Sequence, residues 1–282
     1  MEKLKSIQYG ISSFADISVN DAYYVDKTMF IPEIEKTKFN FLIRPRRFGK
    51  SMFLSMLGLY YDVWSLDSFD TLFKGTWIHE HPTEERGKYL VLYLDFSAVA
   101  QATDDLQKSF NDYCNRRIGH FFRRFKDFIP ESIVNLTLET TVASEKLQII
   151  ADELYTINQK LYVFIDEYDN FTNALLSDEG AELYHQITRQ SGFFKDFFRT
   201  LKNLTSGMNP ALSRLFMTGV SPITLDDVSS GFNIGTNISL MPKFNNILGF
   251  TEKDVSSIFD YYISAGQYPL NKDEAMHLLR KW

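Results

Sequence analysis

Cysteine is nearly absent from this sequence of 282 residues, which contains only Cys114. A single cysteine excludes an intramolecular disulfide and any zinc site built from several cysteines. The strongest apolar runs, 89–94 and 161–165, are far shorter than a bilayer span, and no secretory signal is visible at the start. We therefore expect a soluble cytoplasmic protein with no membrane partner.

An excess of positive charge is also missing, since 30 Lys and Arg face 36 Asp and Glu, a net charge of −6. Global charge does not support nucleic-acid binding, and any polyanion site would have to be local. The segment 115–128 interleaves basic and aromatic residues, which could suit a nucleic-acid strand. At helical spacing, a buried stripe behind a solvated basic face is the interpretation we favour. The stripe consists of Ile118, Phe121, Phe122 and Phe125.

Two other kinds of site are disfavoured. The histidines include one close pair, His79 and His81 in an expected loop, and we expect no metal site there. Residues 271–274 read Asn-Lys-Asp-Glu, which nearly matches the guanine pattern N-K-x-D but ends in Glu. We therefore do not expect GTP as the ligand.

Short apolar runs alternate with long helical patterns along most of the chain. The runs are 39–43, 89–97, 161–166 and 214–220, and the helical patterns are 104–128, 144–159 with a Ser144 cap, and 178–204. Continuous apolar runs separated by helices are typical of parallel strands that are buried on both faces. The pattern predicts a three-layer α/β fold with a mostly parallel central sheet.

The C-terminal part has a different pattern. Thr251 is suited to cap a helix that Gly266 ends, and Asn271 with Glu274 forms a capping-box pattern for a final helix. We expect a core over 1–247 and a partial, truncated helical lid over 248–282. The lid should leave an apolar face uncovered at its end, made of Met276, Leu279 and Trp282.

Gly49, Lys50 and Ser51 match the end of the phosphate-loop pattern G-x-x-x-x-G-K-[S/T]. This fragment alone is weak evidence, because a helix that begins with a glycine and an exposed lysine would look the same. Its context is more specific: a buried strand, a turn and a helix N-terminus together form a cradle for phosphate. Lys50 can reach the terminal phosphates of a nucleotide, and the Ser51 hydroxyl suits Mg²⁺. We expect Lys50 to be exposed in an empty loop.

The first glycine of the pattern is missing, because Arg44 occupies its position. A side chain there could strain the turn, and Pro45 partly compensates by fixing one dihedral angle. The arginine cluster adds positive charge, although some of it could face another domain. The predicted nucleotide-contacting residues are Arg44, Pro45, Arg46, Arg47, Phe48, Gly49, Lys50, Ser51 and Met52.

An acidic pair ends the apolar run 161–166. Asp166 would hold Mg²⁺ together with Ser51, and Glu167 would polarise the attacking water. The bland alternative is a solvated acidic turn. Thr218, where another strand leaves the core, is a candidate contact to the γ-phosphate or the water, but a simple strand end is equally compatible. Further candidates at strand ends are Asp95, Asp169 and Ser221; for the two aspartates, the alternative is that each only caps a helix or turn.

These pieces together resemble the AAA-ATPase-like family of bacterial P-loop proteins. The matching segments are "YYVDKT" (23–28), "FLIRPRRFGKSMFLSML" (41–57), "FIDEYD" (164–169), "MTGVSP" (217–222) and "LGFT" (248–251). The resemblance implies a P-loop NTPase core with an extra strand between the phosphate-loop and acidic strands, a helical lid, and ATP and Mg²⁺ as ligands. Arginine replaces the first glycine in that family too, and many members continue into a restriction-nuclease-like domain. Asp26 and Lys27 would lie near adenine, or simply form a capped turn.

The leading hypothesis is an ATP hydrolase whose cycle changes the conformation of an attached domain or partner. A nucleotide-binding module with little turnover is the alternative, which Arg44 permits and Glu167 argues against. A phosphotransferase is a third hypothesis, for which the sequence shows no acceptor signature.

Overall fold

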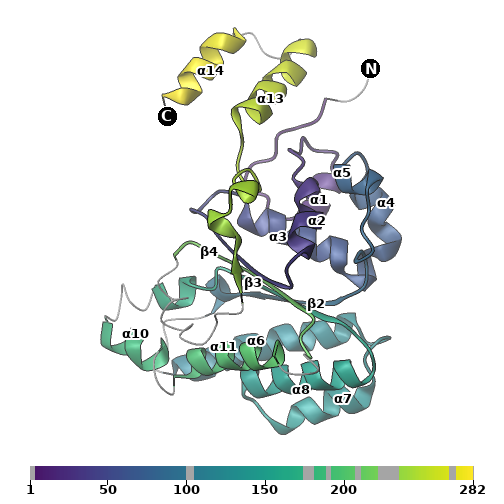
Figure 1. Cartoon of the computed structure of the whole chain (residues 1–282), viewed down its shortest axis with the longest axis vertical. Coiled ribbons are helices and arrows are strands. Elements are labelled where there is room, and N and C mark those ends of the chain that lie inside the picture. The colour runs from purple at the N-terminus through teal and green to yellow at the C-terminus, as the bar shows by residue number, and fades with distance from the viewer. Residues whose placement is uncertain are drawn as a thin grey trace.

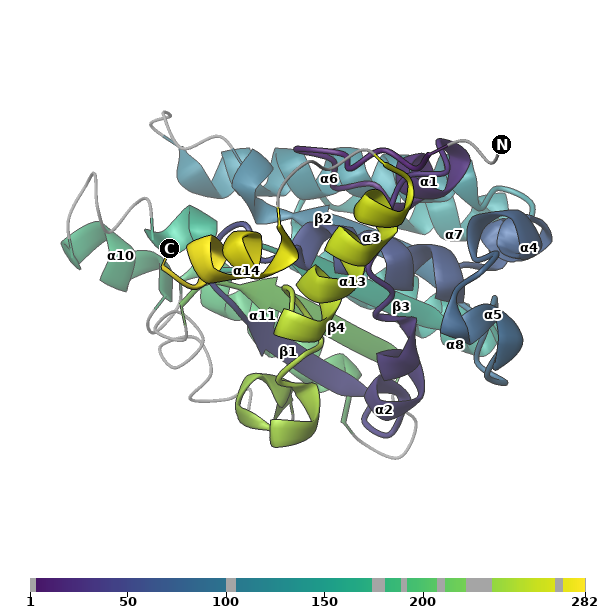
Figure 2. The same cartoon turned by 90° about the horizontal axis from the view of Figure 1, so that it is seen from above.

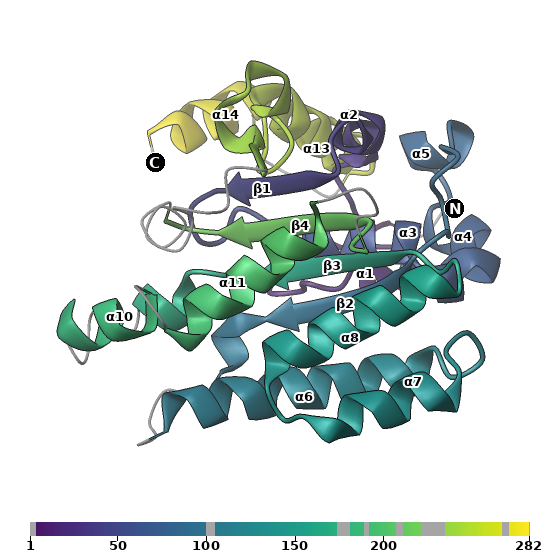
Figure 3. The same ribbon diagram turned by 60° about the horizontal axis from the view of Figure 1, so that its bottom comes forward.

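The chain folds around one parallel sheet. The computed structural model describes residues 4–99, 105–173, 181–188, 192–206, 211–221, 235–266 and 271–281. The strands are β1 (Phe39–Ile43), β2 (Leu90–Asp95), β3 (Leu161–Asp166), β4 (Arg214–Gly219) and β5 (Thr236–Asn237), in the order β2-β3-β4-β1-β5. All described strand pairs are parallel; β3 lies between β2 and β4 (Figure 1), and β4 lies between β3 and β1 (Figure 3). This confirms the α/β fold and the extra strand between the phosphate-loop and acidic strands.

Helices cover both faces of the sheet (Figure 3). The helices on one face are α1 (Phe14–Val19), α2 (Ile31–Glu35), α3 (Lys50–Tyr61), α4 (Phe69–Leu72) and α5 (Trp77–Glu80). Those on the other face are α6 (Leu106–Arg124), α7 (Glu131–Leu136), α8 (Ala143–Thr156), α10 (Ala181–Thr188) and α11 (Phe193–Leu204). Alternate residues of a strand point to opposite faces. In β3, Tyr162 and Phe164 therefore join the α3 core, whereas Val163 and Ile165 join the α6, α8 and α11 core.

Short 3₁₀ segments connect these elements. They are Thr28–Phe30, Val63–Ser68, Phe96–Ala98, Thr137–Glu139, Ile238–Leu240 and Pro242–Phe244. The expected cap at Ser144 is wrong, because α8 begins at Ala143. The reason is a long-range contact: Asn111 of α6 accepts the Ala143 N–H (2.9 Å), so the helix does not need its own serine there. The α6 stripe is confirmed, since Ile118, Phe121, Phe122 and Phe125 are buried.

The last two helices, α13 (Glu252–Ser264) and α14 (Lys272–Arg280), lie at one end of the molecule (Figures 1 and 2). Thr251 caps α13 in a capping box with Asp254, and Gly266 follows its end at a φ of 70°, as predicted. Asn271 caps α14, with its side chain accepting the Asp273 N–H. No described residue of α13 is fully buried.

The predicted apolar face of the last helix is described only in part. Leu279 is 52% exposed, whereas Met276 is half-buried; Trp282 lies outside the described residues. The division of the chain near residue 247 stays a prediction.

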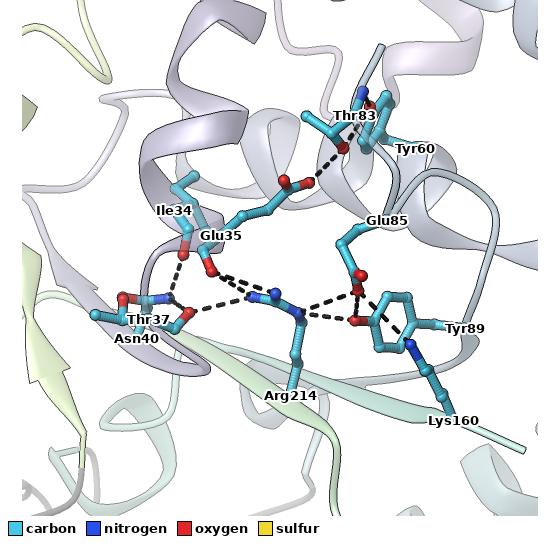
Figure 4. Close-up of polar contacts among 10 residues, drawn as sticks. All are labelled: Ile34, Glu35, Thr37, Asn40, Tyr60, Thr83, Glu85, Tyr89, Lys160 and Arg214. Atoms are coloured by element: carbon cyan, nitrogen blue, oxygen red, sulfur yellow. Dashed lines mark hydrogen bonds and ion pairs between the residues drawn. The ribbon is translucent and has the colours of Figure 1, made fainter. Parts of the chain in front are cut away.

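A buried arginine holds the amino end of the sheet together (Figure 4). Arg214, the first residue of β4, donates hydrogen bonds to the carbonyl oxygens of Glu35 (3.2 and 3.3 Å) and Thr37 (3.2 Å). Its Nε donates to the Tyr89 hydroxyl (2.9 Å) and lies 3.9 Å from the Glu85 carboxylate. Burial alone would raise the pKa of Glu85, but the Tyr89 hydroxyl and nearby cations outweigh it and lower that pKa.

Arg214→Met should lower the free energy of unfolding by roughly 3 kcal/mol, because it leaves buried acceptors and the Glu85 carboxylate without their cation. The matched control is Lys160→Met, which removes a second cation 4.0 Å from Glu85. Lys160 is half exposed, so we expect a loss below about 1 kcal/mol. Urea denaturation measures both values. Equal losses in the two variants would contradict the assignment of the network to Arg214.

Candidate functional site

The loop 44–49 joins β1 to α3 with two residues in the left-handed region. Gly49 precedes the first residue of α3 at a φ of 88°, and Arg47 has a φ of 67°. A side chain at Gly49 would be strained by this backbone conformation. No side chain of the described residues caps the N-terminus of α3. Its first N–H groups and the positive end of its dipole are therefore suited to an anion.

Lys50 is buried, not exposed, so the prediction for an empty loop is wrong. The side chain is only 5% exposed, and Nζ donates to the carbonyl oxygens of Arg44 and Pro45, both at 3.1 Å. A buried ammonium needs acceptors, and the loop curls back to supply them. Burial lowers the pKa of Lys50, while the carboxylates of Glu167 and Asp166 oppose that shift.

Arg44 connects the loop to distant segments. Its N–H donates to the Gly219 carbonyl (3.1 Å), which joins the loop to the end of β4. Its guanidinium donates to the carbonyl oxygens of Ile43 (3.0 Å), Ser239 (2.9 Å) and Phe244 (3.3 Å). The side chain at the missing-glycine position is thus directed toward the segment after β5. It supports the loop from outside.

The remaining loop residues lie on the surface. Pro45, Arg46, Arg47 and Phe48 are exposed. Within the described part of the chain, Arg46 and Arg47 have no hydrogen-bond or ion-pair partner. Their guanidinium groups are therefore available to an anion that enters the loop.

Asp166 and Thr218 meet at the carboxyl ends of adjacent strands. Both are fully buried, and the Thr218 hydroxyl donates to Asp166 Oδ1. The same oxygen accepts the Glu167 N–H (3.0 Å), and Oδ2 accepts the Tyr93 hydroxyl (3.0 Å). Burial and the nearby Asp166 carboxylate raise the pKa of Tyr93, which therefore stays a donor. Sequence reasoning missed Tyr93, although its place on the apolar run beside the acidic strand was a usable signal.

Glu167 follows β3 in the left-handed region, at a φ of 47°. Its Oε2 accepts a hydrogen bond from Asn170 Nδ2 at 2.6 Å. A non-glycine residue in this conformation is strained and tends to occur at functional positions. Sequence reasoning missed Asn170, which lies one turn further along.

Asp169 and Gly219 join the acidic segment to the exit of β4. The Asp169 carboxylate accepts the N–H groups of Val220 (3.1 Å) and Ser221 (2.6 Å). A Cβ at Gly219 would lie 2.4 Å from the Tyr168 ring, so only glycine fits there. Asp169 therefore caps the backbone N–H groups that follow β4 in this structure. Asp95 does the same at the end of β2, where it accepts the N–H and hydroxyl of Ser97.

Ser51 and Asp166 line one cavity of about 620 Å³. The described residues contain no cluster of three or more His, Cys, Asp or Glu side chains that would hold a metal by itself. A cation at Ser51 and Asp166 would thus take most of its ligands from phosphate oxygens and water, as Mg²⁺ does. A serine hydroxyl with a buried carboxylate fits that ion.

Residues 8–229 match the protein family described as "Predicted AAA-ATPase". The chain belongs to this AAA-ATPase-like family. The family match confirms the resemblance; four of the five segments that carried it lie within the matched residues, and 248–251 lies outside them. It also supports a nucleotide binder of the P-loop ATPase type.

Two comparisons with individual proteins add context. The chain is 26% identical to the "Uncharacterized protein in vnfD 5′region" of Azotobacter chroococcum mcd 1. The match covers 99% of this chain and 48% of that protein, so this chain spans about half the length of the relative. The structure of the Aeropyrum pernix ORC2 protein in ADPNP-ADP complexes is similar at a TM-score of 0.38 and 11% identity, over 92% of this chain and 53% of that one.

None of the described helices of this AAA-ATPase-like chain combines the length and the apolar character needed to cross a membrane.

The segment 23–28, which lies within the family match, contacts the start of α13. Lys27 Nζ lies 2.9 Å from Asp254 Oδ2, and the two side chains are 11% and 23% exposed. The same oxygen accepts the Thr251 N–H (2.8 Å). Asp26 accepts the N–H groups of Thr28 (2.8 Å) and Trp77 (2.6 Å), so it forms the capped turn considered from the sequence.

The Lys27–Asp254 pair should make the contact to α13 pH-dependent. Burial alone would raise the pKa of Asp254, but hydrogen bonds from Thr251 and Lys27 outweigh it and hold the pKa below its ordinary value of 3.8. The pair therefore stabilises the contact above pH ~4 and stops doing so as pH falls through the lowered pKa. At pH 7, Lys27→Met should speed amide exchange in α13 by roughly fivefold, the factor for about 1 kcal/mol.

The control for this variant is Lys243→Met, which breaks an exposed pair with Glu33. It should leave exchange in α13 unchanged. If both variants exchange like the wild type, the pair does not hold the helix.

Proposed function

We propose that this chain binds ATP with Mg²⁺ and hydrolyses it, and that turnover changes the conformation of its C-terminal helices or of an attached partner. The main support is that Ser51, at the start of α3, and Asp166, at the end of β3, line the same cavity. A phosphate-binding helix terminus and a metal-binding carboxylate are the two parts that such an enzyme needs side by side.

The phosphates would bind at the loop. The N–H groups at the start of α3 and the guanidinium groups of Arg46 and Arg47 would contact phosphate oxygens. Lys50 would exchange the carbonyl oxygens of Arg44 and Pro45 for phosphate oxygens. Its ammonium would then be paired with negatively charged acceptors in place of neutral ones. Ser51 and Asp166 would hold Mg²⁺, which neutralises charge on the phosphates when bound.

Glu167 is the proposed general base. Its carboxylate is held by Asn170 and lies near enough to Lys50 to affect that pKa, so it belongs to the same electrostatic site. Thr218 would hold Asp166 in place through its hydroxyl, and it could release that bond to contact the γ-phosphate or the water.

The loop tip is placed to pass a change to the C-terminal helices. A Cβ at Gly249 would lie 3.4 Å from the Phe48 ring, so Phe48 packs against the segment that leads into α13. Gly249 has a φ of 74°, which suits a turn. Phosphate that reorders the loop would move Phe48 and with it this segment. The partner of the motion would be an attached domain, such as a nuclease-like one, because the relative is about twice as long.

One observation favours the alternative of a binding module with little turnover. Asn170 binds Glu167 Oε2, which makes that oxygen a weaker acceptor for the proton of a water and leaves Oε1 for this role. Calorimetric titration with ATP, with and without Mg²⁺, and measurement of released phosphate distinguish the two. Mg²⁺-dependent binding with release supports hydrolysis. Binding without release supports the module, and absence of binding rejects both.

A further inference from the structure

The outer face of α6 borders two hollows. One of about 620 Å³ is lined by Arg117, His120 and Arg124, and one of about 530 Å³ by Arg116, His120 and Arg123. His120 lines both, so the hollows meet on this helix. The face lies behind the buried stripe and beside the edge strand β2 (Figure 3). Four arginines of α6 line the two hollows, and four aspartates line them as well: Asp62, Asp95, Asp112 and Asp166.

Much of the positive charge is not neutralised. Across the described ranges, Arg116, His120 and Arg123 have no hydrogen-bond or ion-pair partner. The acidic residue of the second hollow, Asp112, is bound by Lys108 at 3.0 Å. These side chains are therefore free to bind an external anion.

The first hollow is more mixed in charge. Among the described residues, Arg117 donates only through its Nε, to the Tyr93 carbonyl (3.0 Å). Both of its terminal NH₂ groups are therefore available to a ligand. Arg124 pairs with Asp62 at 2.6 and 3.0 Å. Asp95, Ser51 and Asp166 also line this hollow. A ligand along α6 would thus reach the proposed Mg²⁺ end of the ATP site.

An exposed aromatic ring lies next to this basic face. Trp64 is 52% exposed, and the Arg124 guanidinium lies 5.8 Å from its ring centre. A large exposed ring beside arginines provides a surface on which a nucleic-acid base can stack.

We propose that α6 and Trp64 form a binding surface for single-stranded nucleic acid. Residues 116–124 span ~12 Å of helix, enough for about two or three phosphates of an extended strand. Arginine pairs with phosphate through two parallel hydrogen bonds, and Trp64 would stack on a base. Binding to this surface does not depend on ATP hydrolysis; only a coupling between the two rests on the proposed function.

Two other ligands fit less well. A small anion would use one hollow and would not need Trp64. An acidic peptide would match the arginines, but Asp and Glu side chains have no aromatic ring to stack on Trp64. Both are outcomes of the test below.

The test measures fluorescence anisotropy of labelled oligo(dT) and oligo(U) with the full chain, without nucleotide. The wild type should bind with a Kd on the order of 10–100 µM at low salt, and log K should fall with log salt at a slope of about −2. Arg116→Ala/Arg123→Ala should weaken binding at least tenfold at low salt and reduce the slope by about 1. Trp64→Ala should weaken binding at least fivefold, and Trp64→Phe should restore most of it.

The matched control is Lys38→Ala/Lys74→Ala, which removes the same charge from exposed residues outside both hollows. It should bind like the wild type. The proposal is overturned if the wild type does not bind, or if the α6 variant and the control bind equally. Competition by polyglutamate or millimolar phosphate as strong as by unlabelled oligonucleotide, or tighter binding of a duplex hairpin, also overturns it.

Discussion

Lys50→Met should weaken Mg·ATP binding by roughly a hundredfold while leaving the protein as stable as the wild type or slightly more so. The ammonium is the buried cation of the loop, and losing a charged hydrogen-bond donor to phosphate costs about 3 kcal/mol, roughly a hundredfold in Kd. Methionine keeps the apolar stem, so no cavity forms.

The stability part follows from the sign of the pKa shift. Burial lowers the pKa of Lys50 in the folded chain, so the charged form is disfavoured there relative to the unfolded chain. A group with a lowered amine pKa destabilises the fold at pH values where it is charged. Removing that charge should therefore not lower the melting temperature at pH 7.

The control for Lys50→Met is Lys243→Met, which removes an exposed lysine that pairs with Glu33. Calorimetric titration measures affinity, and a thermal melt without nucleotide measures stability. ATP affinity within threefold of the wild type would contradict the phosphate site. A large drop in melting temperature would show that Lys50 has a structural role instead.

Local sequence patterns were sufficient for the parts of the site that depend on neighbouring residues. Gly49 to Ser51 lie at a helix N-terminus because a buried strand and an apolar-rich helix flank them in sequence. Asp166 and Thr218 end apolar runs, and parallel strands place such ends at one edge of the sheet. The fold class followed from the same alternation of strand and helix patterns.

The missed features depend on contacts to backbone groups, some within the loop and some far away in the sequence. The burial of Lys50 is a property of the loop's own carbonyl groups, which no residue pattern specifies. Arg44 bonds to the backbone of Ser239 and Phe244, about two hundred residues away in the sequence. The backbone groups that receive these bonds have no sequence signature. Tyr93 was hidden for a related reason, because an apolar strand permits tyrosine whether or not its hydroxyl has a partner.

The last prediction separates the two acidic residues. Asp166→Asn should weaken the Mg²⁺-dependent part of ATP binding at least tenfold, because a neutral amide is a poor ligand for a hard cation. It should also lower stability by about 1 kcal/mol. The carboxylate accepts the Thr218 hydroxyl and the Glu167 N–H on one oxygen and the Tyr93 hydroxyl on the other. The oxygen of an asparagine side chain can still accept the Thr218 and Glu167 hydrogen bonds, but only if its NH₂ group then faces the Tyr93 hydroxyl.

Glu167→Gln should instead preserve ATP binding and slow turnover. Its amide oxygen can still accept the Asn170 hydrogen bond, so the segment and ATP binding should be preserved. Turnover should fall by roughly 10²–10⁴-fold, the scale for loss of a general base. The decisive measurement compares bound ATP with released phosphate in both variants and in Asn170→Ala, which removes the partner but keeps the base. Turnover of Glu167→Gln at the wild-type rate would place the base elsewhere, and Asp169→Asn would then be the variant to measure, with its stability checked because this carboxylate caps the exit of β4.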